Sequence, residues 1–166
     1  MKNTIATPKK QLFVTLISAF VFVLILSQRH AGFLIIFFAI PFVVWVLYTL
    51  HIAVKNPILR KWNFYRIVTW CVAFLLVFTI HLHYYQVTRE YGNRVAELIL
   101  EYKRIHGTYP VEIEQVGIRK ADLRSNLGMG SYSLNENKPS LFYAVTYIAF
   151  DVYSYNFEIQ DWEYKS

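Results

Sequence analysis

The sequence predicts a membrane α-helical protein with three transmembrane helices and a small α+β outer domain, in which a long helix continuing from the third span packs on an antiparallel β-meander. The first observation is the charge distribution. Residues 1–86 contain eight Lys and Arg and no Asp or Glu, whereas residues 87–166 contain nine basic residues and all eleven acidic ones. The second is that three uncharged runs of 18, 25 and 22 residues lie in the first part. We therefore expect a membrane domain over 1–86 and a soluble domain over 87–166.

Each uncharged run is long enough to cross a bilayer, because about 17–25 apolar residues in a helix span roughly 30 Å of hydrocarbon. We expect spans at about 12–28, 32–54 and 67–86. Their apolar residues are continuous rather than periodic, which is typical of helices that face lipid on several sides. No small-residue cleavage pattern follows the first span, so we expect it to remain as an uncleaved anchor.

The direction of insertion follows from the basic residues, because loops rich in Lys and Arg resist translocation. The tail before the first span holds three of them and the loop from Lys55 to Arg66 holds four, against Arg29 alone in the connection between the first two spans. This pattern predicts a cytoplasmic N-terminus and a C-terminal domain on the outer side. The net charge of +6 therefore comes from cations that flank the membrane, and we expect no nucleic-acid binding.

Pro41 lies within the second span and removes one backbone hydrogen bond there. A packed kink is the simpler interpretation. A hinge or a cavity at this point is the alternative.

Beyond the third span, residues 88–106 carry apolar side chains at spacings of three and four, which predicts that the helix continues into the soluble domain. Gly107 predicts its C-terminal cap. After Pro110 we expect one short turn of helix, followed by a loop over residues 117–130. The apolar anchors of that turn are Val111, Ile113 and Val116.

Alternating apolar residues then predict strands over 131–134, 141–147, 153–159 and 162–164, with a polar turn over 135–138. One face of this meander is aromatic, and burial against the helix is its usual role. The domain has more tyrosines than 80 residues easily bury, and Tyr and Trp often dominate protein interfaces. If a partner binds, we expect it on this face. The candidate partner-binding residues are Tyr143, Tyr147, Tyr153, Tyr155 and Trp162.

This order of features resembles the globular part of a type II secretion pseudopilin and, more loosely, of a type IV pilin. The resemblance rests on a membrane helix that runs into an amphipathic one, on Gly107-Thr108-Tyr109-Pro110, and on a small sheet that ends near Trp162. It covers about half of the chain. The basic leader, the Gly before the cleavage point and the Glu of the mature helix are missing, and the pilin-like helix is the third rather than the first. The resemblance implies a pilin-like domain fixed in a bacterial inner membrane, with the domain in the periplasm.

Three histidines are predicted near the outer membrane face and are weak candidates for a metal or haem site: His30, His81 and His83. On a helix, His81 and His83 are about 200° apart, so they do not chelate one ion together. We expect no metal and no cofactor. His106, just before the Gly107 cap, suits the negative end of the helix.

The sequence carries no other catalytic pattern. Glu112 and Glu114 suit the start of a short helix, where acidic side chains are favoured. Cys71 is a single cysteine within an apolar run, and no phosphate loop, nucleophile elbow or zinc-protease motif is present. We expect a protein without enzymatic activity.

Three functions remain open. The first is an inner-membrane accessory protein whose pilin-like outer domain binds another envelope protein, for example of a pilus or secretion system. The second is a membrane immunity protein that neutralises a toxin acting in the envelope. The third, the least favoured, is a membrane protein that carries a metal or haem for redox chemistry.

Overall fold

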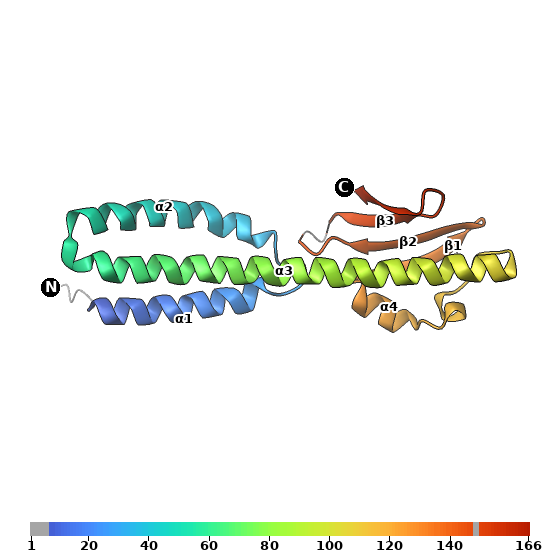
Figure 1. Ribbon diagram of the computed structural model, residues 1–166, viewed down its shortest axis with the longest axis horizontal. Coiled ribbons are helices and arrows are strands. Elements are labelled where there is room, and N and C mark those ends of the chain that lie inside the picture. The colour runs from blue at the N-terminus through green and yellow to red at the C-terminus, as the bar shows by residue number, and fades with distance from the viewer. Residues whose placement is uncertain (1–6, 148–149) are drawn as a thin grey trace. The chain divides into compact units, whose positions relative to one another are not determined.

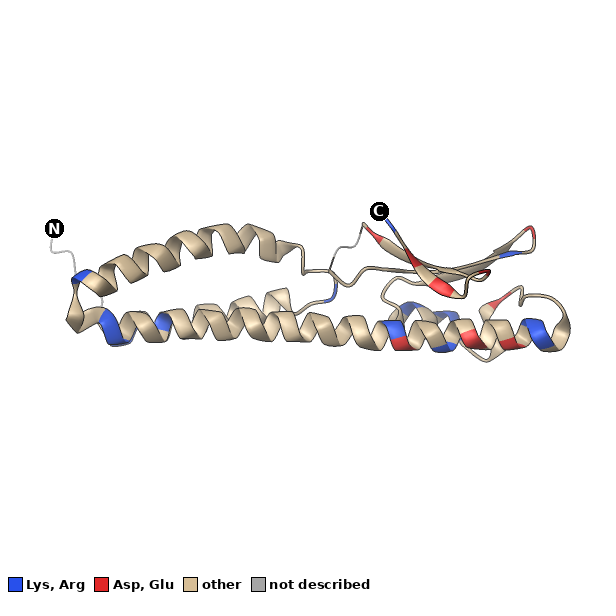
Figure 2. Ribbon diagram, turned by 45° about the horizontal axis from the view of Figure 1, so that its top comes forward, with Lys and Arg blue, Asp and Glu red and all other residues tan. Residues whose placement is uncertain are grey.

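The computed structural model describes residues 7–147 and 150–166. The chain forms two compact units, one up to His81 and one from Leu82 onward. Figure 1 shows the helices of the first unit and the helices and sheet of the second. Acidic residues occur only in the second unit, as Figure 2 shows in red.

The first unit consists of α1 (Pro8–Leu26), α2 (Leu34–Lys55) and the first part of α3 (Pro57–His106). All three helices are long and apolar enough to cross a membrane. Phe22 and Leu26 of α1 pack against Ala73 and Val77 of α3. The rings of Phe42 in α2 and Phe74 in α3 have centroids 4.7 Å apart. Most of the remaining large apolar side chains of these helices are exposed, as expected for surfaces that face lipid.

The prediction of a loop from Lys55 to Arg66 was wrong. Only Asn56 separates α2 from α3, and the latter begins at Pro57. Proline suits the first position of a helix because its missing N–H would have no partner there. The Asn56 side-chain oxygen accepts a hydrogen bond from the Ile58 N–H at 3.2 Å. Basic residues mark the membrane boundary, not the helix start, so the charge pattern placed the beginning of this helix ten residues too late.

Polar contacts link helices α1 and α3. The Arg66 guanidinium donates to the Thr15 hydroxyl at 3.3 Å and to the Gln11 side chain at 3.4 Å. At the other end of the pair, the buried His81 ring nitrogen Nε2 lies 2.8 Å from the Leu26 carbonyl oxygen. Contacts of this kind, together with close packing, are what hold helices together where the surroundings are apolar.

In the second unit α3 continues without a break at Gly92 and ends at His106. Gly107 has φ = +79°, and its N–H donates to the Lys103 carbonyl at 2.8 Å, which confirms the predicted glycine cap. The short helix η1 (Ile113–Val116) and helix α4 (Lys120–Asn126) follow.

Four antiparallel strands complete the unit: β1 (Ser131–Asn135), β2 (Lys138–Ala144), β3 (Val152–Asn156) and β4 (Asp161–Lys165). Their order in the sheet is β1-β2-β3-β4, the predicted meander. The core between helices and sheet is formed by these buried residues: Val95, Ala96, Ile99, Ile113, Leu123, Leu127, Tyr132, Leu141, Tyr143, Phe157 and Trp162.

Helix α4 lies where the sequence predicted only a loop. Leu123 and Leu127, four residues apart, both face the core. Arg119 forms an ion pair of 2.7 Å with Asp122 across its first turn. Among the predicted anchors of the preceding short helix, Ile113 is buried but Val111 is 67% exposed. The apolar signal of α4 was present at helical spacing, but seven residues are too few for the period to stand out.

Two strands end earlier than predicted. Strand β2 stops at Ala144, and the Val145 N–H donates instead to the Asp151 carbonyl at 2.8 Å, so Tyr147 lies outside the sheet. Strand β3 stops at Asn156, whose side-chain oxygen accepts the Glu158 N–H at 2.9 Å and turns the chain. The alternation of aromatic residues continued past both points and concealed these ends.

Candidate functional site

The aromatic face of the sheet is turned toward α3 and the core. In the strand register, Leu141, Tyr155 and Trp162 lie side by side across β2, β3 and β4. Tyr143, Tyr153 and Tyr164 form the neighbouring row. The opposite face carries mainly small polar and charged residues. They include Ser133, Ser140, Ser154, Asn156, Glu163 and Lys165.

This arrangement divides the predicted partner-binding residues. Tyr143 is fully buried and Trp162 is 8% exposed, so both belong to the core and are out of reach of a partner. Tyr153 and Tyr155 are half-buried and pack against that core. Tyr147 is half-buried outside the sheet. The domain covers its aromatic face with its own helix, because that removes the largest apolar area from water.

Trp162 is held tightly against the helix. A Cβ atom added to Gly92 would lie 2.7 Å from the indole Cζ2 atom, so only glycine permits this approach. The indole N–H donates to the Asn93 side-chain oxygen at 2.7 Å. The ring also meets Tyr143 edge to face, with centroids 4.7 Å apart. Packing and a satisfied polar group together fix β4 on α3.

Arg89 organises the polar rim of this cluster. Its guanidinium donates to the Asp161 carboxylate at 3.1 Å and lies 5.7 Å from the Tyr153 ring centroid and 5.5 Å from that of Trp162. Burial raises the pKa of Tyr143 to about 12, while the nearby Arg89 charge opposes the shift. Arg89, Asn93 and Asp161 belong to no motif in the sequence. Arg89 and Asp161 are 72 residues apart, so their pairing leaves no local pattern.

The Gly107–Pro110 element has a structural role here. The buried Tyr132 hydroxyl donates to the Pro110 carbonyl at 2.7 Å, which ties β1 to the end of the helix region. The Tyr109 ring packs on Phe157 at 5.5 Å, and Lys103 Nζ lies 4.2 Å from the Tyr109 centroid. These contacts connect the Gly107–Pro110 element to β1 and to Phe157 of the core.

Two polar hollows open on the outer domain. A concavity of about 500 Å³ is bordered by Lys138, Ser140, Ser154 and Glu163 of the polar sheet face, among others. A second hollow of about 330 Å³ lies between α3 and the start of β4. Both hollows are lined by charged and polar side chains together with aromatic ones.

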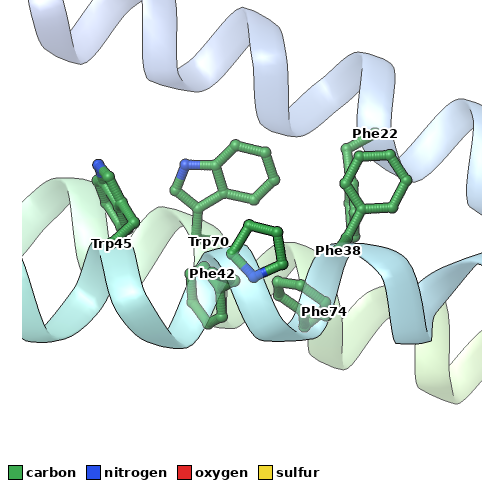
Figure 3. A pocket seen from close by; sticks show the side chains of 7 residues that line it. Phe22, Phe38, Phe42, Trp45, Trp70 and Phe74 are labelled. Atoms are coloured by element: carbon green, nitrogen blue, oxygen red, sulfur yellow. The ribbon is translucent and has the colours of Figure 1, made fainter.

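The first unit contains an aromatic cavity of about 230 Å³ beside the proline of α2. Its lining residues come from all three helices and are Phe22, Phe38, Pro41, Phe42, Trp45, Trp70 and Phe74. Figure 3 shows their rings around a common space. Helix α2 continues through Pro41, and a cavity, one of the features considered for this position, lies next to it.

The histidines do not come together. Of the three candidates, His81 binds the Leu26 carbonyl in the helix pair, and His30 lies in the connection between α1 and α2 with φ = +66°. His83 is exposed on α3. Among residues 7–147 and 150–166, no group of three His, Cys, Asp or Glu side chains could hold a metal ion.

The acidic pair and the last histidine also have local partners. Lys120 Nζ lies 3.5 Å from a Glu112 carboxylate oxygen and 3.7 Å from one of Glu114. The His106 ring nitrogen Nδ1 lies 3.0 Å from the Tyr102 carbonyl oxygen in the last helical turn.

Comparison of the chain with models of known families, with curated proteins and with solved structures finds no match.

Proposed function

We propose that this chain is a membrane-anchored binding protein of the bacterial envelope, whose outer domain holds another envelope protein. The observation that carries the proposal is the continuity of α3. One helix of 50 residues, about 75 Å long at 1.5 Å per residue, contains both an apolar stretch long enough for a membrane and the helix on which the sheet domain is built. The apolar stretch and the first helix of the outer domain are therefore parts of one helix.

The pilin-like character of the outer domain is part of this proposal. A long helix, a short helical connection and a four-stranded antiparallel meander follow one another in the order that the resemblance implies. Gly107 and Pro110 stand at the junction of helix and connection. Because the pilin-like helix follows two other apolar helices, we propose a permanent anchor rather than a subunit that assembles into a filament.

The proposed location is the inner membrane, with a cytoplasmic N-terminus and a periplasmic outer domain. Seven Lys and Arg residues, three in the N-terminal tail and four from Lys55 to Arg66, support this direction. A reporter enzyme that is active only outside the cytoplasm tests it. We expect activity when the reporter follows Ser166 and none when it follows Asn56. The reverse pattern contradicts the proposed direction.

Binding rather than catalysis is supported by the way the domain uses its side chains. The aromatic residues fill the domain interior, and its surface hollows are lined by Lys, Glu, Ser and Asn without an activated nucleophile.

Photo-crosslinking in living cells tests the function. A photoreactive residue is placed in turn at Glu97 on α3 and at Ser133 on β1 and Ser140 on β2, which are neighbours on the polar face of the sheet. We expect at least one position to capture a single envelope protein reproducibly. A photoreactive residue at the exposed Phe13 of α1 is the control, because it should attach to lipid rather than to that protein.

The identity of the captured protein separates the open functions. A pilus or secretion component supports the proposal, whereas a toxin supports an immunity role. If all three outer positions of a folded, inserted protein capture nothing, the binding function is wrong. Visible absorbance of the purified protein would favour the redox alternative.

A further inference from the structure

Arg66 of α3 is a half-buried cation that contacts both other helices of the first unit. Its guanidinium donates to the Thr15 hydroxyl at 3.3 Å and to the Gln11 side-chain oxygen at 3.4 Å, and it lies 5.3 Å from the Trp45 ring centroid. These neutral groups hold the side chain in place but do not balance its charge. Residues 1–86 contain no Asp or Glu, so no side chain of the first unit supplies a counter-ion. A partly buried charge is costly without an anion, and we therefore expect one from outside the chain.

Two hollows of about 270 Å³ each open beside Arg66. The first lies between α1 and α3, and Lys10 and Gln11 line it together with Arg66. The second is lined from all three helices and includes Gln11, Asn63 and Arg66. Within the described part of the chain, the charged residues that line the two hollows are Lys10 and Arg66. An ammonium, a guanidinium and side-chain amides in one place suit the oxygen atoms of a phosphate.

The second hollow meets the aromatic cavity at Trp45, which lines both. Figure 3 shows Trp45 at one end of the cavity, with the rings of Phe22 and Phe38 at the other. On α3, Trp70 lies four residues beyond Arg66, so the cavity begins about 6 Å further along the helix axis at 1.5 Å per residue. A polar space and an apolar one therefore follow each other along the helices.

The size of the aromatic cavity indicates which part of a ligand it holds. Its volume of about 230 Å³ is below the roughly 300–1,000 Å³ of pockets that enclose a whole small molecule. Its lining of aromatic rings and a proline offers no charge. The cavity therefore suits an apolar chain that belongs to a longer molecule, whose charged end lies at Arg66. Such a chain would also restore dispersion contacts that the walls of an unfilled cavity lack.

We propose that the first unit binds one anionic phospholipid, with its phosphate at Arg66 and Lys10 and one acyl chain in the aromatic cavity. The inference rests on the proposed membrane location, because the ligand comes from the surrounding bilayer, and it does not depend on the proposed envelope partner. Charge complementarity selects the headgroup, since this unit has no acidic residue to oppose the two cations. The proposed topology puts both cations on the cytoplasmic side, where basic pockets between membrane helices bind anionic lipids.

A phospholipid fits these spaces better than a smaller ligand does. A free phosphate would balance the Arg66 charge but leave the aromatic cavity empty. A neutral apolar molecule would fill the cavity but leave Arg66 without an anion. A molecule with both parts satisfies both observations, and the bilayer supplies it at high concentration.

Native mass spectrometry of the full purified chain tests the headgroup site, with phosphatidylglycerol and phosphatidylcholine of identical acyl chains as probes. We expect one phosphatidylglycerol per chain, bound about tenfold more tightly than phosphatidylcholine, as one charge-assisted hydrogen bond allows. Arg66→Gln should abolish this preference, and Arg66→Lys should keep most of it because the charge remains. Arg60→Gln is the matched control, since Arg60 is exposed and lines neither hollow.

A photoreactive group in one acyl chain locates the apolar end of the lipid. In nanodiscs, we expect phosphatidylglycerol labelled in this way to attach to Phe38, Trp70 or Phe74, and an excess of unlabelled phosphatidylglycerol to prevent this attachment. Attachment to the exposed Phe13 should not be saturable, because any lipid of the bilayer reaches it. Glycerol phosphate, which is the headgroup phosphate without acyl chains, should not compete.

The outcomes separate this inference from the proposed function. Equal binding of the two lipids, or equal losses in Arg66→Gln and Arg60→Gln, overturns the headgroup site. Labelling of exposed positions alone overturns the acyl-chain site, and full competition by glycerol phosphate overturns the lipid in favour of a free anion. If circular dichroism shows that Arg66→Gln does not fold, Lys10→Gln takes its place, and an unchanged lipid preference then overturns the proposal. No partner protein takes part, so these failures leave the envelope-binding function intact, whereas a chain found in the soluble cell fraction overturns both.

Discussion

The two units of the chain use aromatic side chains in opposite ways. In the first unit, Phe42, Trp70 and Phe74 meet at distances of 4.7 to 6.4 Å and leave a cavity of about 230 Å³ beside them. In the outer domain, Trp162 is packed so closely on Gly92 that a single added carbon would overlap the ring. Aromatic rings thus surround an aromatic cavity in one unit, whereas in the other the Trp162 ring packs directly against a glycine of the helix backbone.

The difference is the one expected when the first unit is surrounded by lipid, as proposed, and the second by water. In water, burial of an aromatic ring is a main driving force, and every lost contact in the core reduces stability. In lipid the surroundings are as apolar as the ring, so helices associate through close contacts and a few polar links. Two buried rings of the outer domain have polar partners: Tyr132 with Pro110 and Trp162 with Asn93. The stability of the outer domain should therefore be sensitive to small changes of side-chain volume, and that of the membrane unit should not.

The largest expected effect is that of removing the central tryptophan. Trp162→Ala should lower the free energy of unfolding of the outer domain by about 3–5 kcal/mol, because it removes a large buried ring and leaves a cavity. The matched change Trp70→Ala in the membrane unit should cost less, since it enlarges an existing cavity that lipid chains can enter. Thermal unfolding followed by near-ultraviolet circular dichroism measures the loss of stability in both variants. Limited proteolysis at sites within each unit shows which unit has unfolded. Equal losses would contradict the comparison.

Overpacking should give the next largest effect. A Cβ atom at Gly130 would lie 2.3 Å from Leu127 Cβ and 3.0 Å from the Phe142 carbonyl oxygen, and one at Gly92 would meet the Trp162 ring. Gly130→Ala and Gly92→Ala should each destabilise the outer domain by about 1–3 kcal/mol. We expect the smaller loss at Gly92, because alanine favours a helix. Melting of the single variants measures the loss.

A second substitution sharpens the same prediction. Trp162→Phe shortens the ring that Gly92 faces, so Gly92→Ala should cost less in the Trp162→Phe background than in the natural sequence. The cost of Gly130→Ala should not change, because Gly130 meets Leu127 and Phe142 instead. Additive losses at positions 92 and 162 would show that the close approach has no energetic weight.

Much of this architecture could be predicted from the sequence, because it depends on local patterns. The three apolar helices, the Gly107 cap and the meander follow from runs, spacings and alternation. The start of α3 at Pro57 did not, because basic residues report the membrane surface and not the helix end. The end of β3 at Asn156 could not be predicted either. The Asn156 side chain accepts a hydrogen bond from the backbone two residues later and ends the strand, although the alternation of apolar residues continues.

The candidate site was less accessible to prediction than the fold. Alternation identified an aromatic face and favoured its burial against the helix, but it did not separate the residues that are fully buried, such as Tyr143 and Trp162, from those that remain candidates for an interface. The hollow between α3 and β4 is lined by residues such as Arg89 and Asp161, which are 72 positions apart. Their pairing depends on the register of the whole meander. No single segment of the sequence carries that information.

Unfolding at alkaline pH tests the buried hydroxyl of Tyr132 in the core of the outer domain. Burial raises the pKa of Tyr132 to about 12 from an ordinary value of 10.0. The folded state therefore favours the protonated hydroxyl, and its contribution to stability is complete below about pH 10 and is lost as the pH rises toward 12. Tyr132→Phe should lower stability at pH 7 by about 1 kcal/mol, the usual net value of a hydrogen bond. It should also make the decline between pH 10 and 12 shallower, while Tyr143 maintains part of it.

Denaturant unfolding at a series of pH values measures this effect. The natural sequence should lose stability steadily across the window and Tyr132→Phe less so. A decline of the same steepness in both proteins would mean that the Tyr132 hydroxyl does not report the buried contact with Pro110. The membrane unit provides the internal control, because its contacts do not depend on a buried tyrosine.

The smallest expected effect lies in the membrane unit, at the link between α1 and α3. His81→Leu removes the contact of 2.8 Å with the Leu26 carbonyl oxygen. Hydrogen bonds between membrane helices contribute about 0.6 kcal/mol on average, so the free energy of unfolding should fall by about that amount. The exposed His83 serves as the control, and His83→Leu should leave the unit unchanged. Unfolding in mixed detergent micelles measures the difference. A loss at His81 as large as that of Trp162→Ala would mean that the membrane unit, like the outer domain, depends on one tightly fitted residue.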